Sequence, residues 1–141
     1  MSLQMTVAER ESFLAGLHVG VIAIPRKQKG PLAVPIWYDY EPGGEPWVIT
    51  DLGSIKGKLL SNASRISLCA QNEGLPYQYV SVEGPFSIRP STRDELLGMA
   101  IRYLGEEQGR AYADNPEGDG ESVVVSIQPE TWFTVDYGKS M

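Results

Sequence analysis

The chain has 141 residues, 42% hydrophobic and 21% charged, which is the composition of a globular protein with a sizeable core. Its net charge of −6 excludes general nucleic-acid binding, and its single cysteine excludes an internal disulfide framework. No apolar run is long enough to span a membrane, and residues 1–5 lack the basic and apolar regions of a secretory signal. We therefore expect one domain over residues 1–141, a cytoplasmic location, and neither nucleic-acid nor membrane partners.

The first half of the chain reads as a helix followed by strands. Thr6 and Glu9 have the spacing of a capping box, and Gly16 is the expected end of the helix that it opens. Strands are then predicted from apolar, aromatic and β-branched runs bounded by turn residues. They cover residues 19–24, 32–40 and 46–50.

A short amphipathic helix is predicted directly after the strand that ends at Thr50. Ser54 is a good N-cap for this helix, and Lys56 and Lys58 place two positive charges near a helix start that already carries unpaired N–H groups. This arrangement suits a phosphate, so the candidate ligands are Thr50, Ser54, Lys56 and Lys58. The alternative is an ordinary capped helix with solvated lysines.

The second half returns to strands and is interrupted by helices. Strands are predicted over 65–71 and 77–89, with a hairpin turn between them and a kink where Glu83 and Gly84 stand. A second capping box, at Thr92 and Glu95, opens a helix to Leu104. The remaining expected elements are a helix over 106–113, a loop over 114–121, and strands over 122–128 and 132–135. The pattern favours a mainly β (α+β) antiparallel barrel or sandwich with flanking helices.

Three blocks of sequence, in this order, carry a family resemblance: residues 31–38, residues 50–58 followed by 65–68, and residues 77–84. They resemble the pyridoxamine-5′-phosphate-oxidase-like split-barrel flavoproteins, especially the actinobacterial members that use the deazaflavin coenzyme F420. The resemblance implies a six-stranded antiparallel split barrel of the FMN-binding type. It also implies a homodimer with the cofactor in a groove at the subunit interface. Ile55 and Leu59 depart from the family pattern, since many relatives carry arginine and asparagine there.

The ring of such a cofactor needs a flat apolar surface and backbone groups for its polar edge. The candidates are Val34, Pro35, Ile36 and Trp37, because a proline in a strand tends to mark an edge or a bulge. Trp37 and Tyr38 point to opposite faces, so at most one of them faces the ring. The alternative role for both is packing in the barrel core or at a dimer contact.

Two tyrosines share one face of the predicted strand 77–89. Tyr77 and Tyr79 are candidates for the substrate side, and Tyr79 is the candidate proton donor. The alternative is a cross-strand aromatic cluster.

Other catalytic motifs are missing from the sequence. The one histidine, His18, forms no metal-ligand spacing, and there is no nucleophile elbow, P-loop or dinucleotide fingerprint, so no metal is expected. Hydride transfer needs few catalytic side chains, because the cofactor carries the chemistry.

We therefore expect an oxidoreductase that transfers a hydride from reduced F420 to an unsaturated or quinone-like small molecule. The alternative is an FMN-binding protein, either an oxidase or a non-enzymatic flavin binder. Deazaflavin carries an acidic polyglutamyl tail, and Arg26, Lys27 and Lys29 are suited to bind it together with the helix lysines. The alternative for these three is a solvated hairpin turn.

Overall fold

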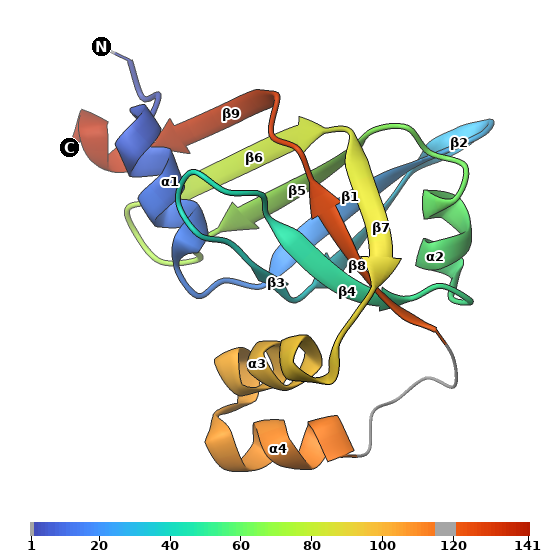
Figure 1. The fold of residues 1–141 in the computed structure, drawn as a ribbon. Helices are drawn as coiled ribbons and strands as arrows, with labels where there is room; N and C mark the ends of the chain where they lie inside the picture. The colour runs from blue at the N-terminus through green and yellow to red at the C-terminus, as the bar shows by residue number, and fades with distance from the viewer. Residues whose placement is uncertain (1, 115–120) are drawn as a thin grey trace.

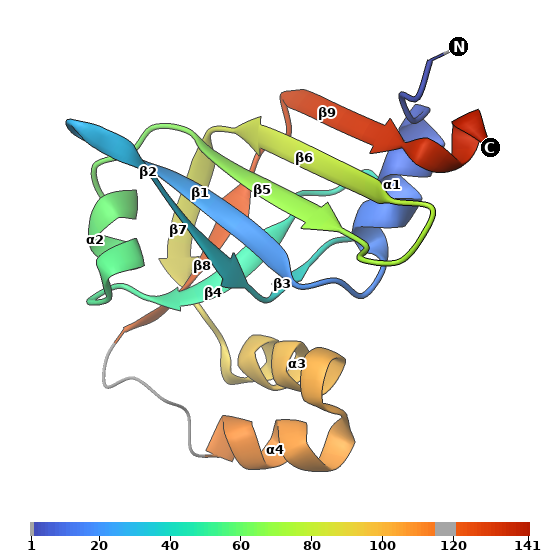
Figure 2. The same ribbon diagram turned by 180° about the vertical axis from the view of Figure 1, so that it is seen from behind.

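The computed structural model describes residues 2–114 and 121–141 (Figures 1 and 2). The described elements are, in chain order, α1 (Val7–Ala15), β1 (Gly20–Arg26), β2 (Lys29–Ile36), β3 (Tyr38–Asp39), β4 (Trp47–Asp51), α2 (Ile55–Leu60), β5 (Ile66–Gln71), β6 (Gln78–Gly84), β7 (Phe86–Pro90), α3 (Arg93–Leu104), α4 (Glu106–Asp114), β8 (Ser122–Ile127), β9 (Thr131–Asp136) and the 3-10 helix η1 (Tyr137–Ser140). Most of the loop predicted over 114–121 lies outside the described residues.

The strands form two antiparallel sheets that enclose one core. The first sheet has the order β2-β1-β5-β6-β9, and the second has the order β3-β4-β8-β7. Side chains alternate along each strand, so every second residue points between the sheets. The inward-facing aliphatic residues include Ile22, Ile24, Leu68, Val80, Val82, Val48, Val125 and Ile127. The predicted mainly antiparallel split barrel with flanking helices is therefore confirmed.

The strand predicted over 32–40 is divided in the structure. β2 ends at Ile36, and β3 belongs to the other sheet. Pro35 has no N–H to donate, and the N–H of Tyr38 bonds to the hydroxyl of Tyr103 (3.0 Å) instead of to a neighbouring strand. The chain thereby crosses from one sheet to the other at Trp37.

The long strand predicted over 77–89 is also divided. The break falls at Pro85, directly after the kink that was expected at Glu83 and Gly84, and β7 continues in the second sheet. Gly84 is required there, because a Cβ would overlap the carbonyl oxygen of Gln128. These two breaks turn the seven strands predicted from the sequence into the nine strands of the described residues. The resemblance implies six.

The helices flank the barrel. Both predicted capping boxes are present, at Thr6 with Glu9 and at Thr92 with Glu95. α1 covers one end of the barrel, α2 packs beside β1 and β4, and the hairpin of α3 and α4 lies below the barrel (Figure 1). In the described part of the chain, no helix is long and apolar enough to cross a membrane.

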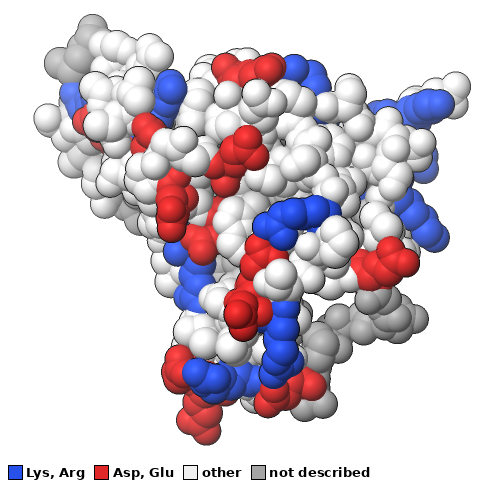
Figure 3. All heavy atoms as spheres, viewed as in Figure 1, with Lys and Arg blue, Asp and Glu red and all other residues white. Residues whose placement is uncertain are grey.

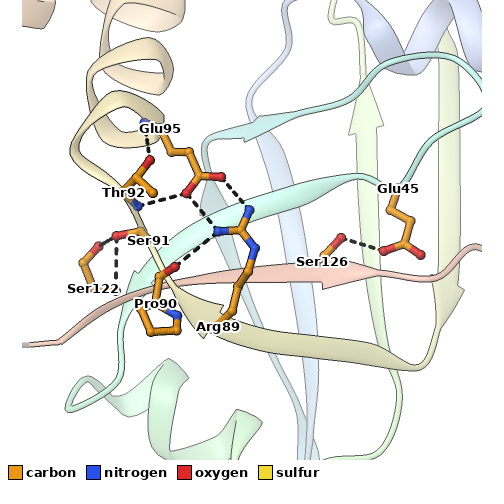
Figure 4. A network of polar contacts seen from close by, with 8 residues as sticks. All are labelled: Glu45, Arg89, Pro90, Ser91, Thr92, Glu95, Ser122 and Ser126. Carbon is orange, nitrogen blue, oxygen red and sulfur yellow. Dashed lines mark hydrogen bonds and ion pairs between the residues drawn. The ribbon is translucent and has the colours of Figure 1, made fainter.

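A polar network joins the start of α3 to the strands above it (Figure 4). The guanidinium of Arg89 pairs with the carboxylate of Glu95, with nitrogen–oxygen distances of 2.9 and 2.5 Å. Glu95 also accepts the backbone N–H of Thr92, and the hydroxyl of Ser91 bonds to that of Ser122 (2.8 Å). The hairpin is thus fixed where it leaves the barrel.

Candidate active site

A pocket of about 500 Å³ lies where β2, β4, α2 and the α3–α4 hairpin meet. Its volume falls within the range of roughly 300–1,000 Å³ that is typical of small-molecule sites. Its lining residues are Val19, Pro35, Ile36, Trp37, Ile49, Thr50, Asp51, Lys56, Leu96 and Tyr112.

Several of the cofactor-binding candidates meet in this pocket. Pro35 and Ile36 end β2 and Trp37 follows them, whereas Thr50 and Lys56 come from the end of β4 and the start of α2. These two groups are far apart in the sequence, and the two sheets bring them together. The pocket therefore has an apolar side and a polar side.

Three other candidates are placed differently. Val34 packs against the core, because it is on the opposite face of β2 from Pro35. Ser54 caps α2: its hydroxyl accepts the N–H of Gly57 (3.1 Å) and lies 3.5 Å from the hydroxyl of Thr50. Lys58 follows in the last turn of α2 and is outside the set of lining residues.

The two adjacent aromatic residues point to opposite sides, as expected. Tyr38 is fully buried in the core and donates its hydroxyl to the carbonyl of Leu14 (2.7 Å), and burial raises the pKa of this phenol. Trp37 lines the pocket. Its indole stacks on Tyr103, with ring centres 5.1 Å apart and an angle of 5° between the rings. Trp37 is therefore held by a second aromatic ring.

The polar side of the pocket contains one charge of each sign. Lys56 provides an ammonium group, and Asp51 provides a carboxylate that accepts the N–H of Gly53 (2.9 Å). Ser54 satisfies the N–H of Gly57, and the earlier N–H groups of α2 have no partner within the helix. This side is suited to bind an anion through Thr50, Lys56 and the adjacent backbone.

Tyr79 lies elsewhere in the structure. It is on β6, and its ring stacks on Phe133 of β9 with centres 6.1 Å apart. Both rings are on the outer face of the five-stranded sheet, and neither lines the pocket. The aromatic cluster that was the alternative for this tyrosine is present.

Five residues of the pocket wall were not predicted from the sequence: Val19, Ile49, Asp51, Leu96 and Tyr112. The last two come from the helical hairpin. Leu96 on α3 and Tyr112 on α4 line the pocket from the side opposite the strands. Tyr112 is 5.5 Å from Trp37 between ring centres, at an angle of 55°. No local pattern points to these residues, because they reach the pocket only after the hairpin folds back below the barrel.

The tip of the β1–β2 hairpin and α2 both carry basic residues. Figure 3 shows blue side chains over the tip of this hairpin and next to α2, at the right of the view. The lysines and arginine of these elements are Arg26, Lys27, Lys29, Lys56 and Lys58. Arg26 donates from Nε to the carbonyl of Gly30 (2.8 Å), so part of its guanidinium is used within the turn.

Together these features define a split barrel with a pocket that is apolar on one side and carries Thr50, Asp51 and Lys56 on the other. Residues 6–136 match the pyridoxamine 5′-phosphate oxidase family, and the chain belongs to this family. No functionally curated protein matches the chain.

Solved structures with the same fold have diverse descriptions. A conserved hypothetical protein of Mycobacterium tuberculosis is 22% identical, with 99% of this chain and 89% of that chain covered and a TM-score of 0.78. A protein described as an F420 reductase is 18% identical, with coverage of 87% and 94% and a TM-score of 0.69. An FAD-binding protein of Mesorhizobium loti is 19% identical, with coverage of 92% for both chains and a TM-score of 0.66. At these identities the comparison shows the fold alone.

Proposed function

We propose that the protein is an F420-dependent oxidoreductase that reduces an unsaturated or quinone-like small molecule. The observation that carries this proposal is the two-sided pocket. It places an aromatic and aliphatic surface next to the ammonium group of Lys56. Membership of an oxidoreductase family and a structural neighbour described as an F420 reductase support it.

The residues present fit a tricyclic ring with a phosphorylated side chain. Pro35, Ile36 and Trp37 offer the flat apolar surface, and the exposed β2 backbone offers polar groups for the ring edge. Thr50, Ser54 and Lys56 are proposed to hold the phosphate, with Lys58 further along the same helix. Val34 supports the ring wall from the core side.

A deazaflavin, when bound, supplies a hydride to the acceptor. The chain's own residues orient and enclose the reactants. Trp37, fixed by its stack on Tyr103, would set the position of the ring, and Lys56 would neutralise the phosphate. Leu96 and Tyr112 line the pocket from the helical hairpin and would exclude water from the reactants once both are bound.

The basic residues at the tip of the β1–β2 hairpin favour F420 over other flavins. The acidic tail of F420 extends beyond its phosphate, and the tip of the β1–β2 hairpin carries Lys27 and Lys29 in an otherwise acidic protein. FMN lacks this tail. An FMN-binding oxidase or non-enzymatic flavin binder is the second candidate, favoured by the family description and by the FAD-binding neighbour.

Cofactor titrations separate the two candidates. The protein is mixed with F420, FMN and FAD in turn, and binding is followed by the absorbance and fluorescence of each cofactor. We expect tight binding of F420 alone, followed by reoxidation of the reduced form by quinones or unsaturated lactones. Retention of FMN through purification, with no turnover of reduced F420, would establish the second candidate.

Lys56 is the residue on which the phosphate assignment depends. Lys56→Ala should weaken cofactor binding by about 1.5–3 kcal/mol, the loss expected for a charge-assisted hydrogen bond. Lys58→Ala removes the same charge from the same helix outside the pocket lining, and we expect a smaller loss. Equal affinities for Lys56→Ala and the parent protein would contradict the assignment.

We also propose that the protein is a homodimer with the cofactor at the interface. Pro35 belongs both to the pocket lining and to the outer face of the five-stranded sheet. A second copy docked on that face would lie beside the pocket opening.

A further inference from the structure

We propose that Leu96 and Tyr112, on the α3–α4 hairpin, form the wall that selects the acceptor and that this wall favours uncharged, planar molecules. The proposal rests on the proposed function, in which this pocket holds both the cofactor ring and the acceptor. It adds which residues contact the acceptor and which class of acceptor they favour, since the identity of the cofactor determines neither.

The hairpin brings Tyr112 into the pocket through a close crossing of its two helices. Gly109 of α4 lies against Ile101 of α3, where an added Cβ would be only 2.7 Å from the Ile101 Cα. One turn after Gly109, Tyr112 reaches Trp37. A larger residue at position 109 would push α4 away and withdraw the tyrosine from the pocket.

Hydrogen bonds from the end of α3 attach the wall to the barrel. The hydroxyl of Tyr103 accepts the N–H of Tyr38 and lies 2.6 Å from the carbonyl of His18, to which it donates. Arg102 donates to the carbonyls of Tyr38 (3.1 Å) and Gly16 (2.8 Å). These bonds and the network in Figure 4 attach both ends of α3, so the wall presents one defined shape.

The hairpin offers the pocket no positive charge. Each of its arginines is paired with an acidic side chain: Arg93 with Asp114 (2.6 Å), Arg102 with Asp39 (3.5 Å) and Arg110 with Glu106 (2.6 Å). Among the described lining residues, Lys56 is the one cation, and it lies at the polar side that the cofactor phosphate would occupy. An acceptor with its own phosphate would find no second cation.

The chemistry of the wall indicates the kind of molecule that fits. Tyr112 and Leu96 present aromatic and aliphatic surface, and aromatic rings prefer stacked or tilted partners with centres about 4.5–7 Å apart. A flat, neutral ring system is therefore favoured over an anionic substrate such as pyridoxamine 5′-phosphate.

Equilibrium binding of 1,4-naphthoquinone to the full chain tests the proposal. Binding is measured by calorimetry, with and without bound oxidised F420, for the parent protein and for Tyr112→Ala, Tyr112→Phe and Leu96→Ala. The matched control is Tyr137→Ala, since Tyr137 is 45% exposed and outside the pocket. Thermal unfolding checks that each variant folds, and Leu96→Ala replaces Tyr112→Ala if the latter does not.

We expect Tyr112→Ala to weaken naphthoquinone binding about tenfold and Tyr112→Phe to change it less than about twofold, because the ring rather than the hydroxyl makes the contact. Tyr137→Ala should bind as the parent does, and pyridoxamine 5′-phosphate should bind more weakly than naphthoquinone. Unchanged binding in both Tyr112→Ala and Leu96→Ala, or tighter binding of pyridoxamine 5′-phosphate, would overturn the proposal.

The two proposals fail in different ways. If F420 does not bind but naphthoquinone binding still depends on Tyr112, the assignment of the wall stands and the proposed cofactor is wrong. If F420 binds and Lys56 is required, while no wall substitution alters naphthoquinone binding, the proposed function stands and the wall assignment is wrong.

Discussion

At the scale of single residues, Gly57 determines how closely α2 approaches the end of β4. An added Cβ would overlap the backbone carbonyl oxygens of Leu52 and Asp51, which cannot rotate away as a side chain would. We expect Gly57→Ala to destabilise the protein by about 1–3 kcal/mol, the usual cost of overpacking. Chemical denaturation measures the change, and cofactor titration should show weaker binding, because α2 carries Lys56.

Gly98 provides the matched control for this substitution. It is also helical, but nothing lies within 4 Å of an added Cβ. Gly98→Ala should therefore stabilise the protein by about 0.5–1 kcal/mol through helix propensity alone. If the two substitutions change stability equally, the contact at Gly57 is not the cause.

At the scale of elements, α3 is held to the barrel by the hydroxyl of Tyr103. Tyr103→Phe leaves the N–H of Tyr38 without its partner and keeps the stacking on Trp37, so we expect a loss of about 1–3 kcal/mol in unfolding free energy. Exposed Tyr137→Phe is the control. Hydrogen exchange should localise the effect, with faster exchange of the α3 amides in Tyr103→Phe only.

The start of α3 is sensitive to acid through Glu95. The bond from Arg89, followed by the backbone bond from Thr92, lowers the pKa of Glu95 from 4.5 to about 2. Because the folded-state pKa is depressed, its stabilisation is complete above pH 4.5 and is lost as the pH falls toward 2. We expect Glu95→Gln to flatten the fall of unfolding free energy over this window, and Glu107→Gln, at an exposed position on α4, to leave it unchanged.

At the scale of the whole molecule, none of the described helices covers the outer face of the five-stranded sheet (Figure 2). A row of directly paired residues crosses it: Pro35, Val21, Cys69, Ser81 and Phe133. Val21 and Phe133 are 38% and 63% exposed. This row has no charged side chain, and the charges of Glu83 and Arg65 elsewhere on the face are paired with each other. Such a surface suits a two-fold contact with a second copy.

Charge substitutions test this contact. Val21→Glu should convert the dimer to a monomer in sedimentation and should weaken cofactor binding, if the pocket is completed by the partner. Ile88→Glu is the matched control, because Ile88 is a strand residue with 37% exposure on the other sheet. A parent protein that sediments as a monomer with bound cofactor would contradict the homodimer.

The sequence alone determined the local elements and the family. Capping boxes at Thr6 and Thr92 and the N-cap at Ser54 are hydrogen bonds between residues three apart, so a short stretch of sequence specifies them. Alternation along the strands indicated the antiparallel sheets, and the three ordered blocks indicated the family to which the chain belongs. The lysine in the pocket was found in the same way, because it directly follows a helix start.

Only the tertiary structure decided which residues share the pocket. Strand periodicity placed Trp37 and Tyr38 on opposite faces, but the crossing between sheets determined that Trp37 faces the pocket. The contact of Trp37 with Tyr112 joins residues 75 positions apart (112 − 37) and depends on the path of all the chain between them. Local sequence does not encode such a contact, because it forms only when the barrel and the hairpin pack together.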